Sequence, residues 1–166
     1  MRKAYFAGGC FWCMTPIFKI QKGVISVISG YCGGDEENPS YEDVKKQKTG
    51  HRETVCITYD ESLISYGRLL EIYLCNVDPY DPGGQFIDRG RSYTLAVYPT
   101  NPEEQETAQN VFRKMEAESG HSPCIALEPF KSFYPAEEEH QDYYLKHPDA
   151  FAEELKTSGR DTFRNS

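Results

Sequence analysis

The 166-residue sequence lacks any apolar run that approaches the ~20 residues needed to span a membrane as a helix. Near its start, the apolar stretch that follows Arg2 and Lys3 ends at Gly8, which makes it too short for a secretory signal. These absences predict a cytoplasmic protein with no membrane partner.

Basic residues are also few. There are 18 Lys and Arg against 26 Asp and Glu, a formal net charge of -8. Nucleic acids and anionic membranes attract basic surfaces, so we expect neither as a partner. The sequence can still form a packed core, since 39% of its residues are hydrophobic and 27% are charged. Its length fits one compact domain, which we place at residues 1–166.

Cysteine is too sparse for a fold held together by disulfides, which are typical of smaller, cysteine-rich secreted domains. Six cysteines are present, at positions 10, 13, 32, 56, 75 and 124. In a reducing compartment we expect thiols, with any disulfide transient and catalytic. The C-x-x-C pair of Cys10 and Cys13 could instead be half of a zinc site, but no second ligand pair follows at a suitable spacing. We therefore expect no metal.

What the sequence does contain is an alternation of short strands and helices. Strands are predicted at residues 3–7, 24–29, 53–59, 95–98 and 125–128, the third with one buried face. Helices are predicted at residues 13–21, 102–119, 137–145 and 148–156. Ser40 is predicted to cap a further short helix, and another helix is predicted to begin at Ser65. Residues 30–34 and 78–91 are predicted loops, the second long enough to indicate function. We expect an α+β fold, a single-domain two-layer sandwich with a ferredoxin-like core, extra helices and long loops.

Cys10 stands out because it follows Gly8 and Gly9 at the end of a predicted strand and precedes a helix. Backbone N–H groups and the helix dipole at such a junction favour a thiolate, which predicts a pKa below the free value of about 8.5. Cys13 lies three residues on, where two sulfurs can join across a first helical turn. Phe11 and Trp12 add an aromatic wall. The segment predicts a redox-active nucleophile at Cys10.

These residues leave two reactions open. The first is thiol–disulfide exchange, which C-x-x-C pairs at helix starts perform. The bulky Phe11 and Trp12 between the cysteines, and the order of strands and helices that follows, fit that class poorly. The second is direct attack by the thiolate on an oxidised atom, which leaves a sulfenic acid for Cys13 or another thiol to resolve.

Gly9-Cys10-Phe11-Trp12 resembles the signature of the peptide methionine sulfoxide reductase A family, which acts on the S epimer of the sulfoxide. The resemblance continues in order along the chain, through blocks at residues 30–34, 38–41, 49–53, 88–93, 133–137 and 140–144. It covers nearly all of residues 5–144 and implies the site roles that follow.

In this resemblance Cys10 matches the nucleophile that attacks the sulfoxide sulfur. Glu53 matches the acid that protonates the sulfoxide oxygen, which requires an apolar site that raises its pKa. Tyr41 and Tyr93 match the phenols that hydrogen-bond this oxygen. Asp88 matches a carboxylate that orders water and its neighbours.

The resemblance also assigns Phe11 and Trp12 to the pocket wall that receives the substrate methyl group, which would fix the handedness of the sulfur. The position of the resolving cysteine differs among members. Cys13 is our first choice because it needs least movement. Cys32 is second, and it stands where many members have Thr.

We therefore expect thiol-dependent reduction of methionine (S)-sulfoxide, free or in proteins, through a sulfenic acid and an intramolecular disulfide. The activity would repair oxidative damage, with thioredoxin or a similar thiol donor as partner and with no cofactor. We expect a monomer. The alternatives are a general thiol–disulfide oxidoreductase and a non-catalytic module that binds sulfoxide or methionine.

Overall fold

A computed structural model describes residues 1–160, and residues 161–166 of the predicted domain lie outside the described part. Its main sheet has the strand order β7-β6-β1-β3-β2-β8. The strands are β1 (Arg2–Gly8), β2 (Val24–Cys32), β3 (Arg52–Tyr59), β6 (Leu95–Val97), β7 (Ile125–Leu127) and β8 (Phe133–Pro135). β6 and β7 are parallel, and the other neighbours are antiparallel. A separate ribbon pairs β4 (Gly84–Gln85) with β5 (Asp88–Arg89).

The helices are α1 (Phe11–Lys19), α2 (Tyr41–Lys45), α3 (Tyr66–Cys75), α4 (Pro102–Ser119), α5 (Tyr143–Lys146) and α6 (Pro148–Ser158), with 3-10 turns η1 (Arg91–Tyr93) and η2 (Glu138–His140). The prediction for residues 102–119 is confirmed at both ends. The Asn101 side chain accepts the Glu104 N–H at 2.9 Å, and Gly120 takes the left-handed conformation that ends many helices. The cap predicted at Ser40 is confirmed, since its hydroxyl accepts the Asp43 N–H. The helix predicted to begin at Ser65 begins at Tyr66, and Ser65 caps it by accepting the Arg68 N–H.

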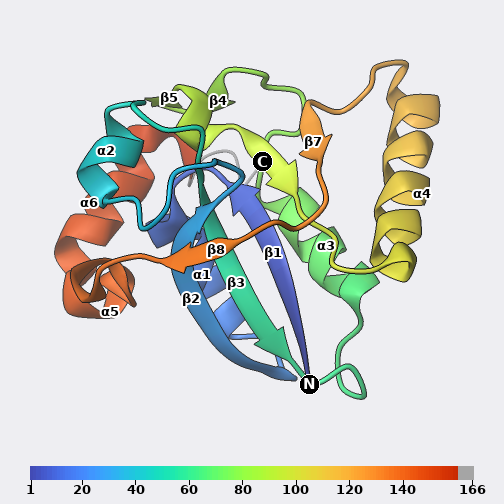
Figure 1. The fold of residues 1–166 in the computed structure, drawn as a ribbon, viewed down its shortest axis with the longest axis horizontal. Helices are drawn as coiled ribbons and strands as arrows, with labels where there is room; N and C mark the ends of the chain where they lie inside the picture. The colour runs from blue at the N-terminus through green and yellow to red at the C-terminus, as the bar shows by residue number, and fades with distance from the viewer. Residues whose placement is uncertain (161–166) are drawn as a thin grey trace.

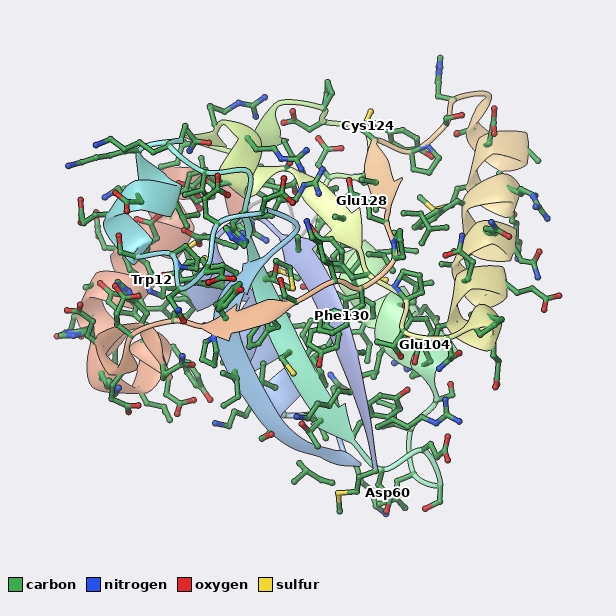
Figure 2. All side chains as sticks on the ribbon, in the orientation of Figure 1. Trp12, Asp60, Glu104, Cys124, Glu128 and Phe130 are labelled. Carbon is green, nitrogen blue, oxygen red and sulfur yellow. The ribbon has the colours of Figure 1, made fainter. Side chains whose placement is uncertain are left out.

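Two hydrophobic clusters lie on opposite faces of the sheet. α1 and α3 cover one face, where Phe6 packs against Phe18. The segment between β7 and β8 crosses the other face (Figure 1), and its Phe130 stacks on Tyr5 with ring centroids 4.1 Å apart. Figure 2 shows Phe130 in front of the sheet. The expectation that residues 53–59 bury one face was wrong, because β3 is a central strand covered on both sides.

β2 extends through Gly30, so the predicted loop 30–34 begins only after Cys32. Gly30 is needed there by its neighbour β8, since an added Cβ would meet the Phe133 ring and the Tyr134 carbonyl. The sequence did not predict β8, whose three residues are too few to show a strand period.

α1 starts at Phe11, two residues before the predicted start at Cys13. Pro16 therefore lies in the second turn rather than the first, and it offers no N–H to the Trp12 carbonyl. The earlier start puts Phe11, Trp12 and Cys13 together in the first turn of the helix. The predicted helix 137–145 is instead η2 and α5, which are separated by a left-handed residue at Asp142. Within residues 1–160, no helix is long and apolar enough to cross a membrane.

Candidate active site

Cys10 lies at the turn between β1 and α1, and its side chain is 6% exposed. Gly9, just before it, has φ +86°, which is a conformation that L side chains rarely adopt. A Cβ at Gly9 would also lie 2.8 Å from the Gln85 Cβ. The glycine thus lets the chain turn tightly before Cys10 and pack closely against Gln85 of the 78–91 loop.

Cys10 and Cys13 form a buried pair of interacting thiols. The Cys10 thiol donates a hydrogen bond to the Cys13 sulfur, and this bond, together with burial and the Glu53 and Asp88 carboxyls, raises the pKa of Cys10 well above its usual value. The same bond lowers the pKa of Cys13, against the effect of burial. The prediction that the helix terminus lowers the Cys10 pKa was wrong, because the hydrogen bond to Cys13, desolvation and nearby acids outweigh the dipole. At neutral pH Cys10 is a thiol.

Glu53 extends from β3 to the start of α1. Its Oε1 accepts the Phe11 N–H at 3.1 Å, and its side chain is 1% exposed. Burial raises the pKa of Glu53 to about 8, with Asp88 adding to the rise and the Phe11 N–H opposing it. Oε2 is buried and has no hydrogen-bond partner. Glu53 is thus a protonated acid at neutral pH with one oxygen available to a ligand.

The other polar residues of the predicted site come from three segments that are far apart in the sequence. Tyr41 is the first residue of α2, Tyr93 ends η1, and Asp88 lies on β5. Burial first, then Glu53, Cys10 and Asp88, raise the pKa of Tyr41, and burial, Glu53, Tyr41 and Asp88 do the same for Tyr93. Burial and Glu154 raise the pKa of Asp88. Both phenols keep their protons and can donate hydrogen bonds to a ligand.

The predicted aromatic wall is present beside Cys10. Phe11 lies 6.1 Å from Tyr41 between ring centroids, and Trp12 stacks on Tyr143 at 4.0 Å. The Trp12 Nε1–H donates to His140 Nδ1 at 3.3 Å, and the His140 ring stacks on Tyr41 at 4.0 Å. Figure 2 shows Trp12 near α2 and α5. His140 and Tyr143 both belong to the motif block at residues 140–144, but the resemblance was not used to give either of them a site role.

Glu137 hydrogen-bonds two residues next to this aromatic wall, and no role was predicted for it from the sequence. Its Oε1 accepts the Tyr31 hydroxyl and its Oε2 the Tyr41 N–H, each at 3.2 Å. It therefore fixes the start of α2, where Tyr41 lies. Glu137, Glu139 and His140 are close enough to share a metal ion; the Trp12 indole donates to His140 Nδ1, and His140 Nε2 lies 3.8 Å from Glu139 Oε1.

Cys32, the second choice for a resolving thiol, belongs to the other face of the sheet. It packs in the cluster that contains Tyr5 and Cys56, and burial raises the pKa of its thiol. The sheet lies between Cys32 and the cluster on the α1 face. Cys13 is the nearer partner for Cys10.

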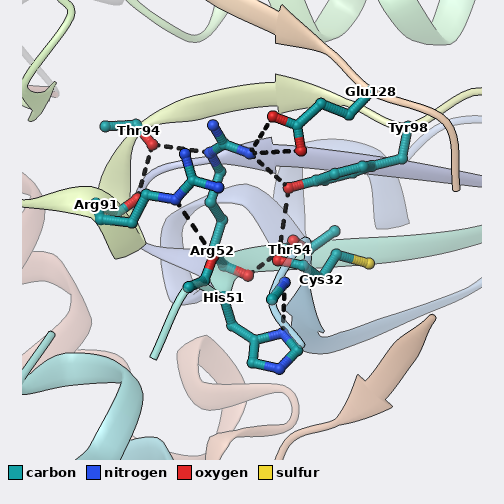
Figure 3. Close-up of polar contacts among 10 residues, drawn as sticks. Cys32, His51, Arg52, Thr54, Arg91, Thr94, Tyr98 and Glu128 are labelled. Carbon is teal, nitrogen blue, oxygen red and sulfur yellow. Dashed lines mark hydrogen bonds and ion pairs between the residues drawn. The ribbon is translucent and has the colours of Figure 1, made fainter. Parts of the chain in front are cut away.

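Arg52 anchors β3 next to Glu53 (Figure 3). Its Nε donates to Thr94 Oγ1 at 2.8 Å, and its Nη1 donates to the Tyr98 hydroxyl at 3.0 Å and pairs with Glu128 at 3.3 Å. Because neighbouring strand residues point to opposite faces, this anchor directs Glu53 toward α1. His51, before it, accepts the Gly34 N–H through Nδ1 and contacts the Glu36 carbonyl through Nε2, which gives it a structural role.

Comparison with known proteins supports the family resemblance seen in the sequence. A family model described as peptide methionine sulfoxide reductase matches residues 2–166. The chain is 48% identical to a peptide methionine sulfoxide reductase MsrA of Ligilactobacillus salivarius, covering 98% of this chain and 95% of the relative. It is 46% identical to that of Halalkalibacterium halodurans, covering 98% and 94%.

Solved structures of methionine sulfoxide reductase A and Mxr1 have the same fold as this chain. Methionine sulfoxide reductase A of Corynebacterium diphtheriae has a TM-score of 0.78 at 27% identity, covering 88% of this chain and 74% of that one. Reduced Mxr1 of Saccharomyces cerevisiae has a TM-score of 0.84 at 24% identity, covering 89% and 86%. With the motif blocks in order and a family match along nearly its whole length, the chain belongs to the peptide methionine sulfoxide reductase family.

Proposed function

We propose that this protein reduces methionine (S)-sulfoxide to methionine, with Cys10 as the nucleophile and Glu53 as the acid. The observation that carries the proposal is the buried, protonated Glu53, which has an unpartnered oxygen and acts electrostatically on Cys10. A sulfoxide oxygen needs a proton when its sulfur is attacked, whereas thiol–disulfide exchange does not use such an acid. This favours sulfoxide reduction over a general oxidoreductase.

In the first step the Cys10 sulfur attacks the sulfoxide sulfur while Glu53 gives its proton to the oxygen. The Cys10 thiol proton then restores Glu53. The net result is transfer of the oxygen: a thiol and a sulfoxide become a sulfenic acid on Cys10 and methionine. The substrate sulfur is reduced and the Cys10 sulfur is oxidised by the same electron pair.

Tyr41 and Tyr93 would hold the sulfoxide oxygen through their hydroxyls, since both stay protonated. Phe11 and Trp12 would receive the methyl group. With the oxygen and the methyl group each fixed, the third substituent can leave the site in one direction only, so one epimer is preferred, and the family resemblance implies that it is the S epimer. Asp88 would order water near the two phenols.

In the second step Cys13 would attack the sulfenic acid and form a disulfide with Cys10. A dithiol protein of the thioredoxin kind would then reduce this disulfide by exchange. Mxr1 of Saccharomyces cerevisiae, a protein of the same fold, has been solved in complex with Trx2. We retain the proposals that the protein acts in the cytoplasm as a monomer, on free or protein-bound substrate and without a metal or organic cofactor.

We also infer that the sheet has a ferredoxin-like core. The order β6-β1-β3-β2, with α1 after β1 and α3 after β3, supports this inference. The position of both helices on one face supports a two-layer sandwich, which the loops and α4–α6 extend.

The test uses separated S and R epimers of methionine sulfoxide with dithiothreitol as the reductant. We expect methionine from the S epimer only, and none from the Cys10→Ser variant. The Cys75→Ser variant is the matched control, since Cys75 is an exposed thiol on α3. Equal reduction of both epimers would contradict the proposed oxygen and methyl sites.

A further inference from the structure

Arg160, the last described residue, is not used by the mechanism above, although its side chain is 1% exposed. Its Nη2 donates to the Gly8 carbonyl at 3.2 Å, and its Nη1 donates to the Asn76 carbonyl at 3.0 Å. Its Cζ lies 4.8 Å from the centre of the Phe86 ring. The guanidinium therefore connects the end of α6 to the last residue of β1, two positions before Cys10.

Among residues 1–160 no carboxylate forms a direct ion pair with this guanidinium, although its charge acts at longer range on Asp88, where it lowers the pKa of that carboxyl against the larger effect of burial. The acceptors are neutral carbonyls and, at 3.6 Å, the Met14 sulfur. A buried cation without a counter-ion in direct contact costs free energy, and a neutral side chain of similar size would avoid this cost. An anion that forms nearby during the reaction would offset it.

Cys13 is the nearby group that can become such an anion. It precedes Met14, whose sulfur contacts Arg160. The hydrogen bond from Cys10 and, after it, the charge of Arg160 lower the pKa of Cys13 against its burial. The acids that face Cys13 oppose the thiolate: Glu154 from α6, Asp88 from β5 and Glu53 from β3. Arg160 supplies the positive charge at this point.

We propose that Arg160 is a positioning residue for disulfide formation, the second step of the proposed function, where it stabilises the Cys13 thiolate beside the Cys10 sulfenic acid. The Cys13 sulfur gives an electron pair to the Cys10 sulfur. The S–S bond forms, the S–O bond breaks, and hydroxide leaves and takes up the proton that Cys13 lost, as water. Cys13 is oxidised and the sulfenic sulfur is reduced. The proposal rests on Cys10 forming a sulfenic acid.

The test is a single turnover of Arg160→Met and Arg160→Lys in the full chain, without reductant. Released methionine reports the first step, and mass spectrometry of dimedone-trapped sulfenic acid against disulfide reports the second. In Arg160→Met we expect disulfide formation to slow by about 10-fold, as loss of one pKa unit of thiolate stabilisation predicts, and methionine release by less than about 3-fold. The pH at which disulfide formation reaches half of its maximal rate should be about one unit higher in Arg160→Met than in the wild type.

Arg160→Lys keeps the charge and loses the fork that spans two carbonyls, so we expect its second step to stay within about 3-fold of the wild type. Arg68→Met removes an exposed arginine of an ion pair on α3 and should change neither step. The proposal is contradicted if Arg160→Met slows both steps equally, if it leaves disulfide formation unchanged, or if Arg160→Lys is as slow as Arg160→Met. Should Arg160→Met fail to fold, Arg160→Gln replaces it as the neutral variant, because Gln lacks the charge but keeps a side-chain N–H donor for the carbonyls.

The outcome can be separated from the proposed function. If the wild type releases no methionine from the sulfoxide, the proposed function fails. Hydrogen peroxide, which converts a thiol to a sulfenic acid and water, then starts the second step on its own. The dependence of disulfide formation on Arg160 is measured in the same variants after this treatment.

Discussion

At the scale of single residues, Cys10 and Glu53 share one buried environment that sets both of their protonation states. The residues around Cys10 indicated a reactive thiol beside an aromatic wall, whereas the two phenols and Asp88 were assigned only through the family resemblance, and these site roles stay predictions. The Cys10 pKa was predicted in the wrong direction, because the hydrogen bond to Cys13 and the burial of the site, to which distant parts of the chain contribute, both raise it. A sequence motif shows which groups are present, but not how much water reaches them.

The first-turnover rate of methionine release should fall as the pH rises through about 8, because Glu53 then loses the proton it must donate. Glu53→Gln should slow this step by about 100-fold or more, in line with the loss of a general acid, and should remove that pH dependence. Rapid-quench measurement from pH 6 to about 10 checks both expectations. A wild-type rate that keeps rising beyond pH 9 would rule out Glu53 as the acid.

The matched variant is Glu154→Gln, which changes a carboxyl on α6 that acts on Asp88 and Cys13. In Glu154→Gln the rate of methionine release should still fall as the pH rises through about 8. Alkylation of Cys10 by iodoacetamide should continue in Glu53→Gln, since the thiol itself is unchanged.

At the scale of elements, the turn between β1 and α1 positions the site. Caps with a clear chemical signature, such as Asn101 with Gly120, could be predicted from the sequence. The start of α1 and the existence of β8 could not, since Cys10 has no capping side chain and β8 forms only by pairing with Gly30–Cys32. Local patterns fail where tertiary pairing decides the structure.

Gly9→Ala should destabilise the protein by about 2–4 kcal/mol and reduce activity, because the new Cβ meets Gln85 in addition to the strain of a positive φ. Gly120→Ala is the matched control, with φ +79° and no atom within 4 Å of the added Cβ. It should cost about 1 kcal/mol and leave activity intact. Urea unfolding and the methionine assay compare the two, and equal losses of stability would contradict the close contact at Gly9.

At the scale of the whole molecule, residues from both ends of the chain meet at one site. The C-terminal region supplies His140, Tyr143, Glu137 and Arg160, which contact residues more than a hundred positions earlier. The first three lie in quoted motif blocks, so the resemblance offered a signal that was not used. Arg160 lies outside every motif block, and its burial against Gly8 is visible only in the folded chain. The boundary at residues 1–166 stays a prediction.

The burial of Glu53 should also make the stability of the whole protein depend on pH. Its pKa rises from 4.5 to about 8 on folding, so between these values the folded state binds more protons than the unfolded state. Stability therefore falls as the pH rises through this window. From pH 5 to pH 8 the free energy of unfolding of wild type should fall by about 2–4 kcal/mol relative to Glu53→Gln.

Urea unfolding of both proteins at pH 5 and pH 8 measures this difference directly. The comparison cancels the contribution of His140, because burial lowers the pKa of this residue in both proteins. If the free energy of unfolding changed equally with pH in both proteins, Glu53 would be hydrated in the folded state and its pKa would not be raised.

The central claim is that Cys10 takes the oxygen of a methionine sulfoxide and that Cys13 resolves the product. One turnover with the S epimer, in the absence of reductant and followed by disulfide mapping, tests it most directly. We predict one methionine per protein and a single Cys10–Cys13 disulfide, with a trapped sulfenic acid on Cys10 in the Cys13→Ser variant. Methionine released without oxidation of Cys10, or a disulfide that lacks Cys13, would contradict the account.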